Sequence, residues 1–191
     1  MTPTTDENVR AFLIAAHGDL ENTKRLLAEH PEWLDITYEW AENNTETPIQ
    51  AAAHVGNRPI AEYLLEQGAP LAIYTAAMLG RRDDVLRMLA DDPETANARG
   101  GHGIPLISHA AMSGDVAIMQ AIADAGGDLS GASGALFGAI GSGSIDMVTW
   151  LLANGADDLT VTNFQNKTLV QVATERGHED IVALLKAHGA E

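Results

Sequence analysis

The feature that most constrains the fold is a glycine that recurs six times with the same surroundings. Eight residues after each of these glycines lies a large apolar residue. Twelve residues after each lies either another glycine or a residue that precedes proline. A short, apolar, Ala-rich segment comes before each one. The six anchor glycines are Gly18, Gly56, Gly80, Gly114, Gly143 and Gly177. Repetition of this kind indicates that one small structural unit recurs along the chain.

Each unit is predicted to contain two short antiparallel helices. The first is Ala-rich, which lets neighbouring helices approach closely, and the anchor glycine provides the left-handed turn that ends it. The second carries a Val/Ile and Leu-Leu stripe at helical spacing, as in SIDMVTWLL and EDIVALL. One such pair cannot bury its own apolar faces. Stacked pairs can, so the sequence predicts an all-α solenoid of about six helix pairs.

The expected organisation is a flexible N-terminus over residues 1–8, followed by a single array over 9–191. The N-terminal segment, MTPTTD, offers no apolar anchor to hold it in place. The boundaries of the repeats are expected near 9–43, 44–70, 71–97, 98–129, 130–160 and 161–190.

Composition limits the partners that such an array can bind. The 191 residues carry a formal net charge of −16, which opposes binding to nucleic acid or to an anionic membrane. The chain has no cysteine, so disulfides and thiolate metal sites are excluded. The sequence shows neither a secretory signal nor an apolar stretch of about 20 residues that could span a bilayer. A cytoplasmic protein is therefore expected.

Several segments resemble the ankyrin-repeat family. The segment TPIQAAAHVG at 47–56 is similar to the family's TPLHxAAxxG, and WLLANGADD is similar to its LLxxGAD. The segment TLVQVATERGHEDIVALLKAHGA at 168–190 resembles a C-terminal repeat. The resemblance covers about residues 9–190. It implies ankyrin-like helix pairs joined by short or irregular β-hairpin fingers. It also implies a scaffold for protein interaction without catalysis.

The spacing between anchor glycines departs from a regular period. The successive steps are 38, 24, 34, 29 and 34 residues. The first step lengthens a finger that contains the segment EWLDITYEWAENNTET. The 24-residue step before Gly80 leaves almost no room for a finger, and a second finger is expected at 97–105. A long aromatic finger beside a missing one predicts a locally exposed, apolar concave face.

Candidate binding residues come from this face and from the long finger. Positions five, two and one before each anchor glycine share one face of the first helix. Alternation along the finger places its two aromatic side chains on one strand face. The predicted binding residues are Tyr38, Trp40, His17, His54, Val55, Tyr74, Met78, Leu79, His109 and Met112.

Two functions fit these residues. The favoured one is a binding module whose apolar, acidic-rimmed groove captures a segment of a partner protein, with its charge favouring a basic partner. The alternative is a site for a small apolar ligand, or an acid/base enzyme such as an isomerase, lyase or hydrolase. The catalytic candidates are then His54, His109, His102 and Glu39. No nucleophile motif is present, and the sequence favours binding over catalysis.

The sequence predicts no metal site and no cofactor. The motif HExxH is absent, and no spacing of histidine and carboxylate residues is typical of a metal site. A set made of His17, His54 and His109 would draw on different repeats, which lie about 10 Å apart when helices stack. Chelation is therefore expected to leave thermal stability unchanged.

Overall fold

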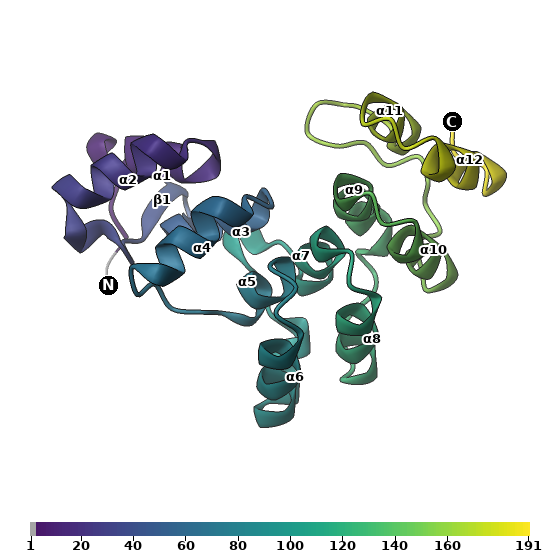
Figure 1. Cartoon of the computed structure of the whole chain (residues 1–191), viewed down its shortest axis with the longest axis horizontal. Coiled ribbons are helices and arrows are strands. Elements are labelled where there is room, and N and C mark those ends of the chain that lie inside the picture. The colour runs from purple at the N-terminus through teal and green to yellow at the C-terminus, as the bar shows by residue number, and fades with distance from the viewer. Residues whose placement is uncertain (1–2) are drawn as a thin grey trace. The chain divides into compact units, whose positions relative to one another are not determined.

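The computed structural model describes residues 3–191, and over that range it consists mainly of helices (Figure 1). The elements in chain order are α1 (Glu7–Gly18), α2 (Leu20–Glu29), η1 (Pro31–Trp33), β1 (Tyr38–Ala41), β2 (Asn44–Glu46), α3 (Pro48–His54), α4 (Arg58–Glu66), α5 (Ile73–Met78), α6 (Arg82–Asp91), η2 (Pro93–Asn97), η3 (Gly101–Gly103), α7 (Leu106–Ser113), α8 (Val116–Asp124), α9 (Ala132–Ser142), α10 (Ile145–Ala153), α11 (Leu169–Glu175) and α12 (Glu179–Ala187).

The predicted helix pairs are confirmed. Each of the six anchor glycines lies between the two helices of a pair or at the end of the first, as Gly114 does between α7 and α8. Gly114 has a φ of 72°, the left-handed conformation that ends α7. Gly18 differs, because it is the last residue of α1 and the turn falls at Asp19 instead. The predicted fold class, an all-α solenoid with small hairpin fingers, is therefore confirmed.

The contacts within the chain group its residues into two compact units. One unit comprises the residues up to Thr75 together with Arg99–Ile104. The other comprises Ala76–Ala98 and Pro105–Glu191. The boundary at residue 75 falls inside α5, whereas the short segment 99–104 separates two stretches of the second unit. We call the unit that contains the residues up to Thr75 the first unit, and the other one the second unit.

In the first unit, the long finger is a two-stranded antiparallel hairpin. Strand β1 pairs with β2 so that Tyr38 faces Glu46, and an irregularity in the register lies at Trp40. Thr4 extends this pairing, because its N–H donates to the Thr37 carbonyl and its carbonyl accepts from the Glu39 N–H, both at 2.9 Å. Thr4 is thus paired with the hairpin and α1 begins at Glu7, both within the segment 1–8 for which flexibility is expected. Residues 1 and 2 lie outside the described residues.

In the second unit, close packing of first helices depends on small side chains. Helix α9 lies against α7, and a Cβ atom at Gly138 would approach the Ser108 carbonyl oxygen and the Met112 side chain at 3.1 Å. Buried Ala110, Ala111 and Ala139 belong to the same two helices. Glycine and alanine thus allow the backbones to approach closely, as the Ala-rich pattern predicted.

The predicted exposure of the first-helix face is wrong at three positions. Met78 and Leu79 are buried at 0% and 5% relative exposure, and His109 is fully buried. Met112 is half-buried, whereas Val55 is 47% exposed. The missing finger before Gly80 therefore leaves no open apolar strip along Met78 and Leu79.

The core contact of α9 predicts a measurable loss of stability on truncation. Leu136 is fully buried, so Leu136→Ala should lower the free energy of unfolding by about 3 kcal/mol through lost burial and the cavity left behind. Leu86 on α6 is 45% exposed, and Leu86→Ala should cost less than about 0.5 kcal/mol. Urea unfolding followed by circular dichroism measures both. Equal shifts for the two variants would contradict the assigned core.

Candidate functional site

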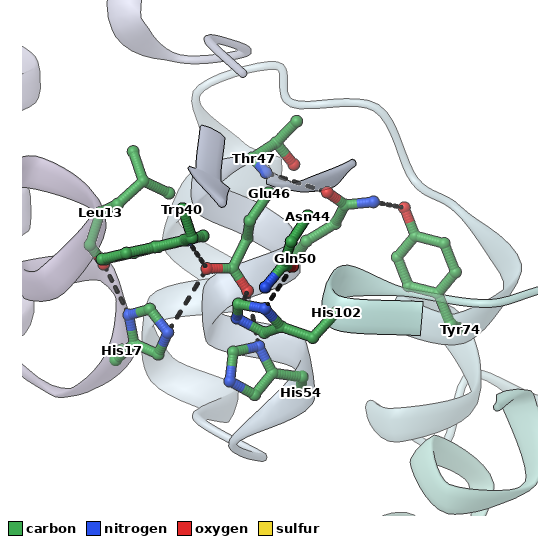
Figure 2. Close-up of polar contacts among 10 residues, drawn as sticks. All are labelled: Leu13, His17, Trp40, Asn44, Glu46, Thr47, Gln50, His54, Tyr74 and His102. Carbon is green, nitrogen blue, oxygen red and sulfur yellow. Dashed lines mark hydrogen bonds and ion pairs between the residues drawn. The ribbon is translucent and has the colours of Figure 1, made fainter. Parts of the chain in front are cut away.

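The described residues bring three imidazoles and one carboxylate together in the first unit (Figure 2). The residues are His17, Glu46, His54 and His102, and one potential ligand atom from each lies within 4.8 Å of all the others. We call this set the His–Glu cluster. Its members are far apart in the sequence, so it is a product of the tertiary fold.

Four different elements supply the cluster. His17 lies in the last turn of α1, and His54 is the last residue of α3. Glu46 ends strand β2, and His102 is the middle residue of η3. The two helical histidines therefore lie at helix C-termini, where the backbone dipoles favour a positive charge.

Glu46 lies at the centre of the cluster and is fully buried. Its Oε1 atom lies 2.7 Å from His54 Nδ1 and 3.3 Å from His102 Nε2. Its Oε2 atom lies 3.5 Å from His17 Nε2 and accepts a hydrogen bond from Trp40 Nε1 at 3.1 Å. A buried carboxylate is costly unless positive charge or hydrogen-bond donors surround it, and among these contacts the Trp40 N–H is the hydrogen-bond donor.

The outer nitrogens of two imidazoles are engaged with oxygen atoms. His17 Nδ1 lies 2.7 Å from the Leu13 carbonyl oxygen. His102 Nδ1 lies 2.8 Å from Asn44 Oδ1. A proton on each Nδ1 satisfies these contacts, which leaves each neutral ring with a lone pair on Nε2 directed at Glu46.

Two buried atoms at the centre of the cluster have no hydrogen-bond partner among the described residues. They are Glu46 Oε1 and His54 Nδ1, which lie close to each other but fail the directional requirement of a hydrogen bond. Buried polar atoms are nearly always satisfied in native proteins, so an orphaned pair of this kind needs an explanation.

The electrostatics of the cluster affect two pKa values. Burial lowers the pKa of His17 below its ordinary value, against the opposing effects of the Leu13 carbonyl and Glu46. Burial alone would raise the pKa of Glu46, but the interaction with His54 and the charges of His17 and His102 outweigh it and lower the pKa. A carboxylate anion beside a neutral His17 imidazole is thus favoured.

The loop that carries His102 is shaped to approach Glu46. A Cβ atom at Gly101 would lie 2.7 Å from Glu46 Oε1, so any other residue there would displace the Glu46 carboxylate. His102 itself adopts φ 55°, a left-handed conformation that costs free energy in a residue other than glycine. Backbone strain of this kind persists where the surrounding contacts hold it.

The structure brings together some of the predicted residues and not others. Trp40 is half-buried and contacts Glu46, and its ring packs edge-on against Tyr38 at 4.9 Å between centroids. Tyr38 itself is buried, so it does not project into a groove. Tyr74 is half-buried, and its hydroxyl accepts a hydrogen bond from Gln50 Nε2 at 2.9 Å, while burial raises its pKa.

Two of the catalytic candidates lie elsewhere. His109 is in α7 of the second unit, with Nδ1 3.1 Å from the Pro105 carbonyl oxygen. Glu39 was expected to orient an imidazole, but the carboxylate that contacts the imidazoles is Glu46. Sequence reasoning missed Glu46. The sequence feature that could have indicated Glu46 is its position opposite Tyr38 in the predicted hairpin. Residues that face each other across a hairpin lie on the same face of it.

The second unit has surface features of a different kind. A shallow, open depression is lined by Gly80, Arg81, Arg82, Asp83, Asp84 and Asp115. Arg82 and Asp115 form a two-bonded ion pair across it, at 2.9 and 3.0 Å. This depression is polar, unlike the predicted apolar groove. Phe164, in the loop between α10 and α11, is 93% exposed.

Stacked helix pairs joined by short turns and occasional fingers define a helical repeat protein. A family model described as ankyrin repeats, in three copies, matches residues 107–191, and a single ankyrin-repeat model matches residues 44–76. Together the two matches span more than half of the chain, and the chain belongs to the ankyrin-repeat family. Ankyrin repeats are generally protein-interaction modules.

No curated protein matches this chain. Over residues 3–191, no helix has the length and apolar character needed to cross a membrane.

The hydrogen bond from Trp40 to Glu46 predicts a selective loss of stability. Trp40→Phe removes the only N–H of the indole ring and leaves Glu46 Oε2 with one donor fewer in a buried site. The cost should be about 1–3 kcal/mol of unfolding free energy. Trp150→Phe is the matched control, because the bond from Trp150 Nε1 to Gln120 lies at the solvent-exposed surface. Urea unfolding compares the two, and an equal loss in both variants would contradict the assigned role.

Proposed function

We propose that this protein is a binding module for a basic segment of a partner protein. Membership of the ankyrin-repeat family supports a role in protein interaction. The net charge of −16 supports a basic partner, because opposite charge accelerates encounter and disfavours acidic competitors.

The observation that carries the proposal is the exposure of Phe164 on an ordered loop. Asn163 Oδ1 accepts hydrogen bonds from the N–H groups of Gln165 and Lys167, at 2.9 and 3.0 Å. Thr162 pairs with Thr168 in an antiparallel bridge at the base of the loop. Figure 1 shows this loop between α10 and α11 as an extended trace within the second unit. Because these bonds order the backbone of the loop, an exposed aromatic side chain carried on it would bind with a smaller cost of backbone ordering.

Acidic groups lie next to this loop in the chain. Asp157 and Asp158 are both exposed and precede the loop by a few residues. Hydrogen bonds from the Thr160 hydroxyl and from its backbone N–H hold the pKa of Asp158 below its ordinary value. Both features favour a partner segment in which an apolar residue is flanked by Lys or Arg.

The proposed contact differs from the groove expected from the sequence. Among the predicted anchors, Val55 is exposed, and Trp40, Tyr74 and Met112 are half-buried. Met78, Leu79 and Tyr38 are buried and are not part of the proposed surface.

A peptide array tests this proposal. Peptides with one aromatic or aliphatic residue flanked by Lys or Arg should bind, and the binding should weaken as salt is raised. Phe164→Ala should weaken the tightest complex about tenfold, equal to about 1.4 kcal/mol, as measured by fluorescence polarisation. Leu86→Ala removes another exposed apolar side chain of the same unit and should leave affinity within about twofold. Unchanged affinity in Phe164→Ala would contradict the proposal.

The His–Glu cluster supports a second candidate function, acid/base chemistry on a small apolar ligand. His54 and His102 both lie within 3.3 Å of the buried Glu46 carboxylate, and an imidazole paired with a carboxylate is a common general acid or base. Ligand-observed NMR with a set of small carbonyl compounds tests it. Two results would support acid/base chemistry. The wild-type protein should bind a carbonyl compound and exchange protons at the carbon next to its carbonyl, and His54→Ala should lose this binding. Absence of both would oppose it.

A further inference from the structure

We propose that His17, Glu46, His54 and His102 form a binding site for a divalent transition-metal cation, with zinc as the preferred ion. This inference concerns the first unit and does not depend on the peptide-binding role assigned to Phe164 in the second unit.

The distances within the cluster match those between ligands around one metal ion. Zinc–nitrogen and zinc–oxygen bonds of about 2.0–2.1 Å place tetrahedral ligand atoms about 3.3 Å apart. The contacts of Glu46 with the three imidazole nitrogens measure 2.7, 3.3 and 3.5 Å. All four potential ligand atoms lie within 4.8 Å of one another. To surround one ion, the longer separations must contract and the 2.7 Å contact with His54 must lengthen by about 0.6 Å.

The lone pairs of the cluster face inward. With protons on Nδ1, the Nε2 atoms of His17 and His102 present lone pairs to the carboxylate of Glu46, which is itself an acceptor. Acceptors that face one another repel unless a cation lies between them. The orphaned atoms Glu46 Oε1 and His54 Nδ1 lie in the same place, and a bound metal ion would satisfy both.

The surrounding groups orient the proposed ligands as groups around protein metal sites do. The Leu13 carbonyl holds the His17 ring, and Asn44 holds the His102 ring, each through the nitrogen that faces away from Glu46. Trp40 Nε1 holds the second oxygen of Glu46. Metal-ligating histidines almost always donate their other N–H to an oxygen, which fixes the tautomer and the ring direction.

The donor set indicates the class of metal. Three imidazole nitrogens and one carboxylate oxygen suit zinc and its neighbours in the first transition row, whereas calcium and magnesium prefer oxygen ligands. The side chains of His17 and His102 are 27% and 30% exposed, so an ion has access from solvent.

The expected absence of a metal site rested on a histidine set that included His109. The structure places His109 in the second unit, where its Nδ1 lies beside the Pro105 carbonyl oxygen. The finger brings Glu46 between the helical histidines instead, and η3 brings His102 to the same point. The distance between repeats is thus no obstacle, since two of the four ligands come from loops and fingers.

Calorimetric titration of the full chain with zinc chloride, after dialysis against a chelator, tests the proposal directly. One zinc per chain should bind. Thermal unfolding at a zinc concentration 100 times Kd should show the folded-to-unfolded ratio raised about 100-fold, and EDTA should reverse the effect. Cobalt in place of zinc should give the visible absorption bands of a four-coordinate ion. Absence of one-to-one binding would overturn the proposal.

Variants separate this site from weak surface binding. Glu46→Gln and His102→Ala should each weaken zinc affinity at least tenfold, with circular dichroism confirming that the variant is folded. His102 lies in a short loop, so its variant tests the site even if Glu46→Gln fails to fold. His188→Ala is the matched control, because His188 Nδ1 also lies beside a backbone carbonyl, that of Leu184, and His188 is not a member of the His–Glu cluster. Wild-type affinity in His102→Ala, or an equal loss in His188→Ala, would overturn the proposal.

Discussion

The structure depends on one constraint, which is that a short helix pair cannot cover its own apolar face. Each pair must be covered by the next, and side-chain size at the contact decides how close the backbones come. Gly138 against Ser108 and Met112 is one case, since a Cβ atom there would lie 3.1 Å from the facing helix, closer than nearly all such contacts in proteins. This requirement explains both the Ala-rich first helices and the Leu-rich second helices, because the two occupy different layers of the stack.

The repeats were predictable from sequence because they depend on local rules. The turn at Gly114 requires a positive φ, and the stripe ending in Leu151 follows helical periodicity, so both can be recognised without a structure. Exposure was harder to predict. A missing finger before Gly80 implied an open face, yet Met78 and Leu79 are buried, because burial depends on what the whole fold places against a residue rather than on one loop.

The His–Glu cluster was only partly predictable for the same reason. Repeat register placed His17 and His54 on one side of the array, and His102, in the segment GGHG, was among the catalytic candidates. The position of Glu46 depends on the pairing of β1 with β2 and on the register irregularity at Trp40. A buried carboxylate cannot be distinguished in sequence from the exposed acidic residues around it. Non-local contacts of this kind decide which of several plausible residues meet.

The composition of the His–Glu cluster has a consequence for its chemical durability. Thiolate metal sites are destroyed when peroxide converts their sulfur ligands to sulfenic acids or disulfides. The present chain has no cysteine, and imidazole and carboxylate groups do not enter that series of reactions. A cation held by His17, Glu46, His54 and His102 would therefore be retained under oxidative stress that empties a zinc finger.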